Sequence, residues 1–117
     1  MKTILITGSN SDIGIAVAKA LSEHPVKLAL QYYSNQAKAE SLKNWLDEKN
    51  INNTLFKADL SHPSSAERLI QETLKEFGSL DVLINVVGPF IYKNILESLS
   101  LNGLYSRLSK TLVLRKI

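Results

Sequence analysis

Short apolar runs alternate along the chain with longer stretches in which apolar residues recur at helical spacing. The short runs predict β-strands at residues 2–7, 26–33, 54–58 and 80–87. The longer stretches predict amphipathic helices at residues 13–23, 37–49 and about 63–77. Strands that alternate with helices of this length form βαβ units, so the pattern predicts an α/β fold built on a parallel sheet.

Residues with special backbone preferences stand where the predicted helices begin and end. Pro25 follows the first helix and stops it. Ser61 or Ser64 is expected to cap the third helix, because a hydroxyl can accept a bond from a free N–H at a helix start, and Pro63 suits its first turn. Gly78 is expected to end the same helix.

The fourth run is apolar on both faces, which is typical of a strand in the middle of a parallel sheet. Right-handed crossovers and doubly wound connectivity place the four strands in the order 3-2-1-4. We therefore expect a doubly wound parallel sheet with helices on both faces.

The pattern weakens after Gly88 and Pro89. Apolar residues return at helical spacing over residues 99–115, which predicts one last helix with no strand after it. On this interpretation the fourth strand is an uncovered apolar edge, which is a surface for pairing with another chain. The sequence then resembles the first half of a larger fold.

Composition limits the classes of protein that the chain can represent. The 117 residues are enough for one domain, and the absence of cysteine excludes disulfides and thiolate metal sites. No apolar run approaches the roughly 18 residues of a membrane span, and the first residues do not have the pattern of a signal peptide. We expect a cytoplasmic protein that binds neither a membrane nor a metal ion.

The net charge of +3 is concentrated in the last part of the chain, since residues 90–117 contain five basic side chains and one acidic side chain. Such a tail can contact an anionic surface. Basic residues near a helix C-terminus also suit the helix dipole, and we interpret the excess as a solvated helix end without nucleic-acid binding.

The strongest candidate site is the turn between the first strand and the first helix, residues 7–14. Gly8 allows a sharp turn, and Gly14 lets the helix lie close to the sheet. Backbone N–H groups and the polar Ser9, Asn10 and Ser11 are expected to face a ligand between them, where the positive helix end favours a pyrophosphate. The alternative is an ordinary turn in which Asp12 caps the helix.

This turn resembles the Thr-Gly-x-x-x-Gly-x-Gly motif of the short-chain dehydrogenase/reductase family. Thr7, Gly8 and Gly14 match in register, and Asp12 stands at the middle glycine. Asp59-Leu60 after the third strand and Asn85-Val86-Val87-Gly88 after the fourth resemble two further motifs of the family. The resemblance covers residues 1 to about 90 and implies an NAD(P)-binding Rossmann-like sheet.

The resemblance also implies which residues bind the dinucleotide. They are Gly8, Ser9, Asn10, Ser11, Asp12, Ile13, Gly14, Tyr33, Ser34, Asn35, Asp59, Leu60, Asn85, Val87 and Gly88. An acid at the end of the second strand would repel a 2′-phosphate, but Tyr32 stands there and the first acid is Glu40. We therefore expect NADP in preference to NAD, although no Arg or Lys stands there to bind the 2′-phosphate, since Lys38 lies further along the chain.

The catalytic residues that the resemblance implies, a serine and a Tyr-x-x-x-Lys pair, are absent from residues 1–117, and Tyr105 and Lys110 are five apart. We expect residues 1–90 to form the dinucleotide-binding units and 91–117 a divergent or truncated helical tail. Either a deletion or a frameshift accounts for that tail. The chain is then the inactive cofactor-binding part of an enzyme that moves a hydride between NADP(H) and a carbonyl or alcohol.

Two other functions remain open. The first is a non-catalytic interaction module that forms a homo-oligomer through the edge of the fourth strand or the 99–115 helix. The second is a binder of another adenosine ligand such as S-adenosylmethionine, which is disfavoured because the second strand does not end in an acid.

Overall fold

The computed structural model describes residues 1–86, 94–95, 97–98 and 110–113. Its strands are β1 (Lys2–Thr7), β2 (Val26–Tyr32), β3 (Asn52–Lys57), β4 (Val82–Asn85) and β5 (Lys110–Val113). The helices between them are α1 (Asp12–Leu21), α2 (Gln36–Glu48) and α3 (Pro63–Phe77). All neighbouring strands pair in parallel, in the order β3-β2-β1-β4-β5. The predicted order 3-2-1-4 is confirmed, and the fold is a Rossmann-like doubly wound sheet.

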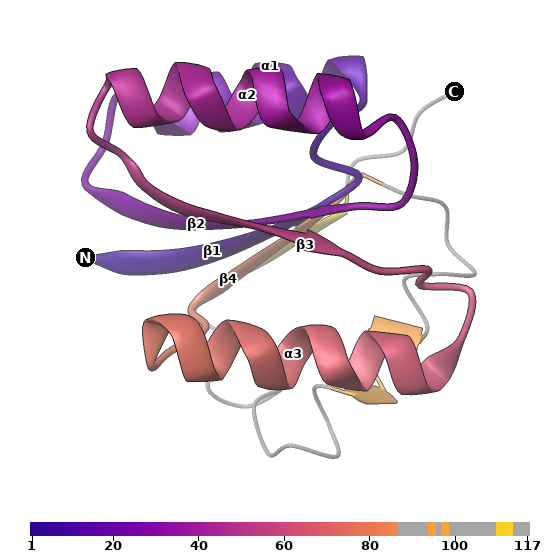
Figure 1. The fold of residues 1–117 in the computed structure, drawn as a ribbon. Helices are drawn as coiled ribbons and strands as arrows, with labels where there is room; N and C mark the ends of the chain where they lie inside the picture. Colours follow the sequence, from indigo (N-terminus) through magenta and orange to yellow (C-terminus); the bar gives the residue numbers. More distant parts are fainter. Residues whose placement is uncertain (87–93, 96, 99–109, 114–117) are drawn as a thin grey trace.

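The sheet lies between two helical layers, with α1 and α2 on one face and α3 on the other (Figure 1). Successive side chains of a strand point to opposite faces. In β1, Ile4 and Ile6 therefore belong to the core on the α1 and α2 side, whereas Leu5 belongs to the core under α3. Ile95 is fully buried in the second of these cores.

The carboxyl ends of the parallel strands meet at one edge of the sheet, the right-hand edge in Figure 1. Thr7, the last residue of β1, lies opposite Asn85 at the end of β4. The loop that follows β2 and the loop that follows β3 open at the same edge. This edge gathers every described residue that the sequence assigned to a dinucleotide.

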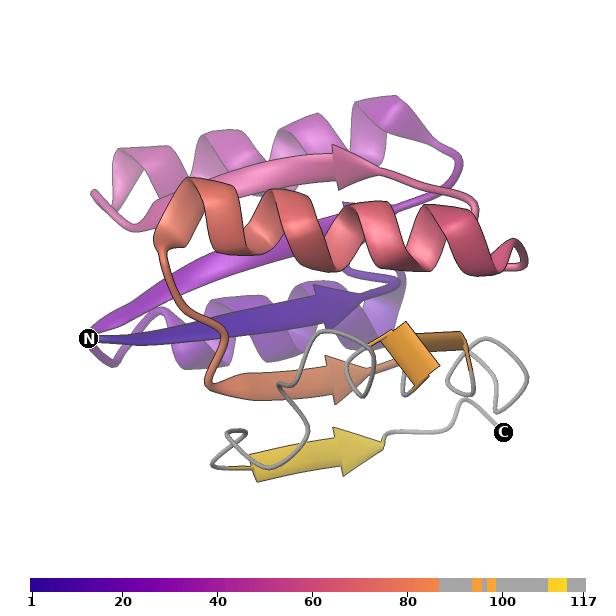
Figure 2. The same ribbon diagram turned by 90° about the horizontal axis from the view of Figure 1, so that it is seen from below.

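The fourth strand is not an edge strand, and the expectation of an uncovered apolar edge is wrong. β5 pairs with β4 over four residues, and the two lie side by side in Figure 2. The helix expected at 99–115 is also wrong over Lys110–Val113, where the backbone is extended and hydrogen-bonded to β4. The rest of that segment, 99–109 and 114–117, lies outside the described residues.

The start of α3 differs from the predicted capping. His62 occupies the N-cap position and makes no side-chain capping bond, and Pro63 is in the first turn as expected. Ser61 instead donates its hydroxyl to Asp59, at 2.6 Å from Oδ1, so it is not the cap. Gly78 ends the helix with a φ of 77°, as predicted. Within the part of the chain that the structure describes, no helix has the length and apolar character of a membrane span.

Candidate functional site

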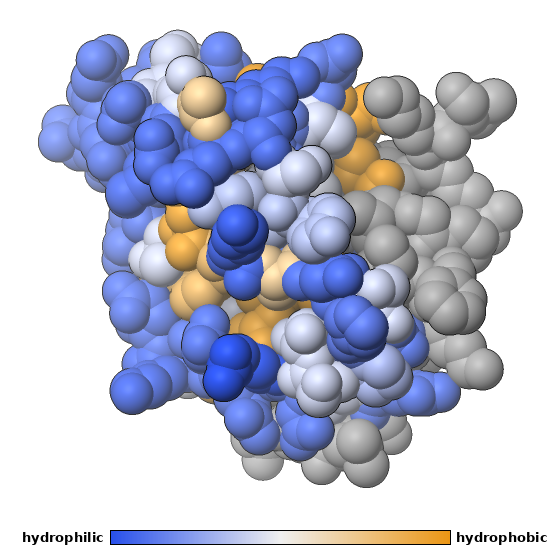
Figure 3. All heavy atoms as spheres, turned by 45° about the vertical axis from the view of Figure 1, so that its right-hand side comes forward, coloured by the Kyte–Doolittle hydropathy of each residue, from blue (hydrophilic) through white to orange (hydrophobic). Residues whose placement is uncertain are grey.

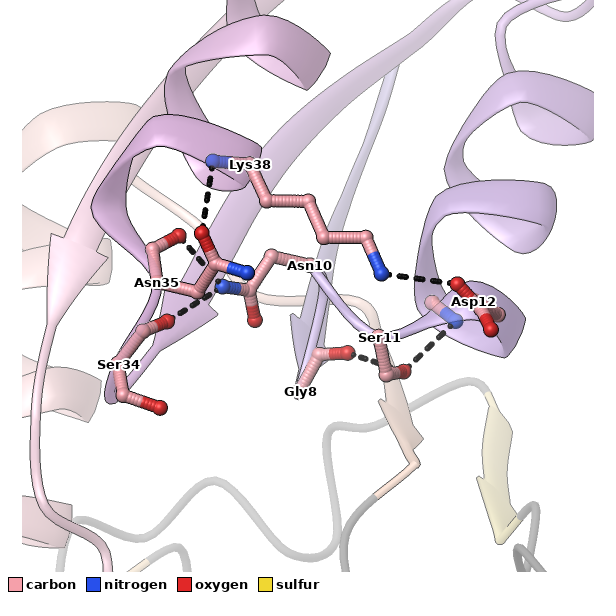
Figure 4. Close-up of polar contacts among 8 residues, drawn as sticks. Gly8, Asn10, Ser11, Asp12, Ser34, Asn35 and Lys38 are labelled. Atoms are coloured by element: carbon pink, nitrogen blue, oxygen red, sulfur yellow. Dashed lines mark hydrogen bonds and ion pairs between the residues drawn. The ribbon is translucent and has the colours of Figure 1, made fainter.

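The turn after β1 is held by bonds within itself. Gly8 adopts a left-handed φ of 65°, and its carbonyl accepts bonds from the Ser11 amide at 3.1 Å and the Ser11 hydroxyl at 2.8 Å. The Ser11 hydroxyl in turn accepts the Gly14 N–H at 3.1 Å, so Ser11 is the N-cap of α1 (Figure 4). The alternative in which Asp12 caps the helix is therefore wrong by one residue, since Asp12 begins the helix.

Gly14 brings the first turn of α1 against the backbone of the glycine turn. A Cβ atom at this position would lie 2.2 Å from the Gly8 carbonyl oxygen and 2.7 Å from the Ser9 Cα. No side chain fits at such distances, and the obstructing atoms are backbone that has no rotamer to change. Gly14 thus sets how closely the N-terminus of α1 approaches the end of β1.

Like Ser11, the other two polar side chains expected to face a ligand contact the protein instead. The hydroxyl of Ser9 is buried and donates to the Gln31 carbonyl at 2.9 Å. The side-chain amide of Asn10 extends from the glycine turn to the loop after β2 and donates to the carbonyls of Ser34 and Asn35, at 2.6 and 3.1 Å. The Ser9 N–H donates to the same Gln31 carbonyl at 2.9 Å, so both donors of Ser9 are engaged within the protein.

The backbone N–H groups of Asn10 and Ile13 have no hydrogen-bond partner among the described residues. Ile13 lies in the first turn of α1, where free N–H groups and the helix dipole favour an anion, and Asn10 lies in the turn directly before the N-cap. The close approach of Gly14 to the Gly8 carbonyl brings this helix start directly against the glycine turn, an arrangement that suits a phosphate bound by backbone N–H groups. The residues present therefore fit a phosphate-bearing ligand.

Asp12 forms an ion pair that links the two helix starts. Its Oδ1 lies 2.8 Å from Nζ of Lys38, in the first turn of α2. Figure 4 shows the Lys38 side chain extended across the gap between α2 and α1, beside Asn10. The carboxylate is thus engaged by a cation, which offsets its charge at the mouth of the turn.

The two tyrosines at the end of β2 differ in burial. Tyr32 is buried at 6% exposure, whereas Tyr33 is 60% exposed. Asn35 takes a left-handed φ of 60° and caps α2 by accepting the Lys38 N–H at 3.3 Å. Tyr33, Ser34 and Asn35, which follow β2, are called the rim below, and Asn10 binds the carbonyls of the last two. Tyr32, at the place of the acid considered from the sequence, is therefore a packing residue.

Gln31 was missed by the sequence analysis and joins three strand ends. Its Oε1 accepts the Gly8 N–H at 2.7 Å, and its Nε2 donates to the Ala58 carbonyl at 2.8 Å. The side chain is 2% exposed, and the backbone carbonyl of the same residue binds Ser9. The available signal was a polar residue within an otherwise apolar run, directly before the loop.

Asp59 follows β3 and accepts two bonds from Ser61. The Ser61 hydroxyl, and then the Ser61 N–H at 3.1 Å from Oδ1, hold the pKa of the Asp59 carboxyl below its ordinary value. The imidazole of His62 lies 3.4 Å from the other carboxylate oxygen. Asp59 is therefore ionised at neutral pH and remains about a third exposed at the edge of the sheet.

Leu60 and Asn85 are buried. The Leu60 side chain belongs to the core under α3, and its carbonyl accepts the Asn94 amide at 2.9 Å. The Oδ1 atom of Asn85 accepts the Thr7 hydroxyl at 2.5 Å, across β1 and β4. Val87 and Gly88, also assigned to the dinucleotide, lie outside the described residues.

A hollow of about 300 Å³ opens between the ends of β2 and β3 and the N-terminal half of α3. Its lining contains Tyr33, Lys57, Ala58, Asp59, Ser65, Arg68, Leu69 and Glu72. In Figure 3, which turns this side forward, apolar surface is recessed between polar side chains. Two residues predicted from separate motifs, Tyr33 and Asp59, therefore share one concave surface. Among the described residues, no group of three or more acidic, histidine or cysteine side chains is placed to hold a metal ion.

The profile of the family described as short chain dehydrogenase matches residues 2–103. A 3-oxoacyl-(acyl-carrier-protein) reductase, FabG, of Staphylococcus aureus is 31% identical over 87 residues, which are 74% of this chain and 35% of that protein. The chain thus spans about a third of the length of the curated relatives that it matches.

Solved structures of similar proteins contain both forms of the dinucleotide. A dehydrogenase from Burkholderia cenocepacia with bound NADP is 32% identical, with a TM-score of 0.70 over 74% of this chain and 34% of that one. An NADH-dependent reductase, A1-R′, complexed with NAD is 33% identical, with a TM-score of 0.68 over 74% of this chain and 36% of that one. Together with the family match over most of its length, these likenesses show that the chain belongs to the short-chain dehydrogenase family of oxidoreductases.

Proposed function

We propose that residues 1–117 bind a nicotinamide dinucleotide at the carboxyl edge of the sheet. The pyrophosphate is assigned to the turn from Gly8 to Gly14, and the adenosine end to the rim of Tyr33, Ser34 and Asn35 with Asp59. The observation that carries this proposal is the contact of Gly14 with the Gly8 carbonyl, which presents the unpaired N–H groups of Asn10 and Ile13 at a helix start.

The remaining residues assigned at the ends of β3 and β4 are proposed to shape the site rather than to bind the dinucleotide through polar groups. Leu60 and Asn85 are buried and shape the floor at the ends of β3 and β4. For Val87 and Gly88, contact with the dinucleotide is proposed from the sequence motif alone.

NADP is proposed in preference to NAD because no carboxylate ends β2. Tyr32 is buried there, and the first acid beyond it is Glu40 on α2. A 2′-phosphate next to the rim would meet hydroxyl and amide groups and the ammonium of Lys38, and it would not be repelled by a neighbouring acid on the strand. The relatives include one with NADP and one with NAD, so the choice between the two rests on the end of β2 alone.

For a full-length relative that contains this cofactor-binding part, the proposed reaction is hydride exchange between NADP(H) and a carbonyl or alcohol. A bound nicotinamide supplies or accepts the hydride. The FabG relative, a reductase of 3-oxoacyl thioesters by name, supports a carbonyl substrate. Residues 1–117 contain no tyrosine followed four positions later by lysine, so we propose that this chain by itself binds the dinucleotide and does not turn over.

A non-catalytic interaction module is not favoured by any observation of the described residues. Its basis was an open edge on β4 and a helix at 99–115; β5 occupies that edge, and Lys110–Val113 is a strand. The division at residue 90 and the cytoplasmic location remain predictions. Expression of residues 1–90 as a folded unit would test the division, and cell fractionation would test the location.

The binding proposal is tested by thermal melts of the chain with titrated NADP⁺, NAD⁺ and nicotinamide mononucleotide. A ligand that binds the native state only, at about 100 times its Kd, stabilises it by about 2.7 kcal/mol, a rise in Tm of roughly 10 °C. We expect such a rise with NADP⁺, a smaller one with NAD⁺ and none with the mononucleotide, which has no adenosine. A cooperative melt that neither dinucleotide shifts would contradict the proposal. Oxidation of NADPH by the chain with a 3-oxoacyl thioester would contradict the absence of turnover.

A further inference from the structure

The ion pair between Asp12 and Lys38 links the two parts of the proposed dinucleotide site, the glycine turn after β1 and the rim at the end of β2. Lys38 rises from the first turn of α2 and reaches Asp12, the first residue of α1, at 2.8 Å (Figure 4). Beneath it, Asn10 binds the carbonyls of Ser34 and Asn35. The ammonium therefore lies between the glycine turn and the rim at the end of β2.

That position matters for a ligand whose pyrophosphate occupies the turn and whose adenosine ribose occupies the rim. The 2′ substituent of such a ribose lies beside the residues that follow the second strand, which here form the rim below Lys38. A 2′-phosphate at that position is within reach of the ammonium that now binds Asp12. NAD has a hydroxyl there and gains little from a cation.

The carboxylate of Asp12 competes with such a phosphate. Both partners of the pair are accessible, with side-chain exposures of 40% for Lys38 and 86% for Asp12, so the pair is weak and exchangeable. Asp12 also places a negative charge at a helix start that otherwise favours an anion. The family motif has glycine, with no charge, at this position.

We propose that Asp12 is a specificity-determining residue, which holds Lys38 and thereby reduces the preference of this site for a 2′-phosphorylated dinucleotide over NAD. Lys38 is the group that binds the 2′-phosphate when Asp12 releases it. The inference rests on the proposed function, because it needs a dinucleotide in this orientation. It goes further by assigning cofactor choice to one exchangeable ion pair.

Calorimetric titration with adenosine 2′,5′-bisphosphate and adenosine 5′-monophosphate tests the inference, because these probes differ only in the 2′-phosphate. The measured quantity is the ratio of their dissociation constants. Asp12→Asn is expected to raise the preference for the bisphosphate roughly twofold to fivefold, the range set by coupling in exposed ion pairs. Lys38→Gln is expected to lower it. Glu40→Gln removes a neighbouring exposed charge whose one side-chain bond within the described residues is to Gln36, and it should leave the preference unchanged.

The decisive comparison is Asp12→Asn in the Lys38→Gln background, where the gain should disappear. Asp12→Glu keeps the charge at the helix start and should retain the wild-type preference, which separates a folding defect from loss of the pair. A gain that survives in the Lys38→Gln background, or equal gains for both probes, would overturn the inference while leaving the proposed function intact. Binding of neither probe nor either dinucleotide by the folded wild-type chain would overturn both.

Discussion

The amide N–H of Gly8 donates to Oε1 of Gln31 at 2.7 Å, so the glycine turn is anchored to the neighbouring strand by a buried side chain. The nitrogen of the same Gln31 side-chain amide donates to the Ala58 carbonyl at 2.8 Å. One residue therefore joins the carboxyl ends of β1, β2 and β3. This arrangement fixes the turn relative to the rim and the Asp59 loop before any ligand arrives.

Replacement of Gln31 by leucine should destabilise the chain and weaken dinucleotide binding. Leucine keeps the volume but leaves the Gly8 N–H and the Ala58 carbonyl without this partner, at a cost of roughly 1–3 kcal/mol. Urea denaturation measures the free energy of unfolding. Gln36→Leu is the matched control, because the Gln36 side chain is exposed and, in the part of the chain that the structure describes, bonds Glu40 alone. It should change the stability by less than about 0.5 kcal/mol. Equal stability of the two variants would contradict the anchoring role.

Replacement of Gly14 by alanine should move the glycine turn. The new methyl group would stand 2.2 Å from the Gly8 carbonyl oxygen, so the backbone must shift, at a cost of roughly 1–3 kcal/mol. We expect a lower Tm together with weaker NADP⁺ binding by calorimetry.

Gly78→Ala provides the contrast for that variant. Gly78 has a φ of 77°, and a Cβ added there would meet no atom within 4 Å, so alanine costs about 1–2 kcal/mol through backbone strain alone. It should lower the Tm without changing NADP⁺ affinity. If Gly14→Ala binds NADP⁺ as tightly as Gly78→Ala does, the close approach does not shape the site.

Replacement of Ser61 by alanine should raise the pKa of Asp59 toward its ordinary value. The Ser61 hydroxyl is the largest cause of the lowered pKa, and the Ser61 N–H bond remains in the variant. A pKa lowered by folding gives stability that is present above the unfolded pKa and is lost as pH falls through the folded pKa. The stability difference between wild type and Ser61→Ala should therefore be full at neutral pH and vanish in strong acid.

An NMR titration of the Asp59 carboxyl carbon, with chemical denaturation at several pH values, measures both effects. Ser64→Ala is the matched control, because Ser64 is an exposed serine three residues further along, in the first turn of α3. An unchanged Asp59 titration in Ser61→Ala would show that the hydroxyl bond does not form in solution.

Much of the fold follows from local patterns. The four strands from 2 to 87 are short apolar runs between clear helix stretches, so their type and order were predictable. β5 was not, because Lys110–Val113 is a short apolar run whose spacing also fits a helix, and short runs do not distinguish the two by periodicity. Its pairing with β4 is a tertiary contact that no local pattern encodes.

Some residues of the candidate site were likewise predictable from local sequence, and others were not. The positions of Gly8 and Gly14 were predictable because a strand, a tight turn and a helix follow each other directly in the sequence. Gln31 and Lys38 were not assigned, since each acts on a residue more than 20 positions away. The capping residue was misplaced by one position because Ser11 and Asp12 both have capping side chains and only geometry distinguishes them.

The central claim, that a dinucleotide binds at the glycine turn, is tested most directly by amide NMR spectra of the isotope-labelled chain titrated with NADP⁺. We predict saturable shifts of the Gly8, Asn10 and Ile13 amides, with smaller changes at Tyr33 and Asp59, and none on the far end of α3. Saturable shifts confined to other parts of the chain, or no shifts at millimolar NADP⁺ in a folded protein, would contradict the account.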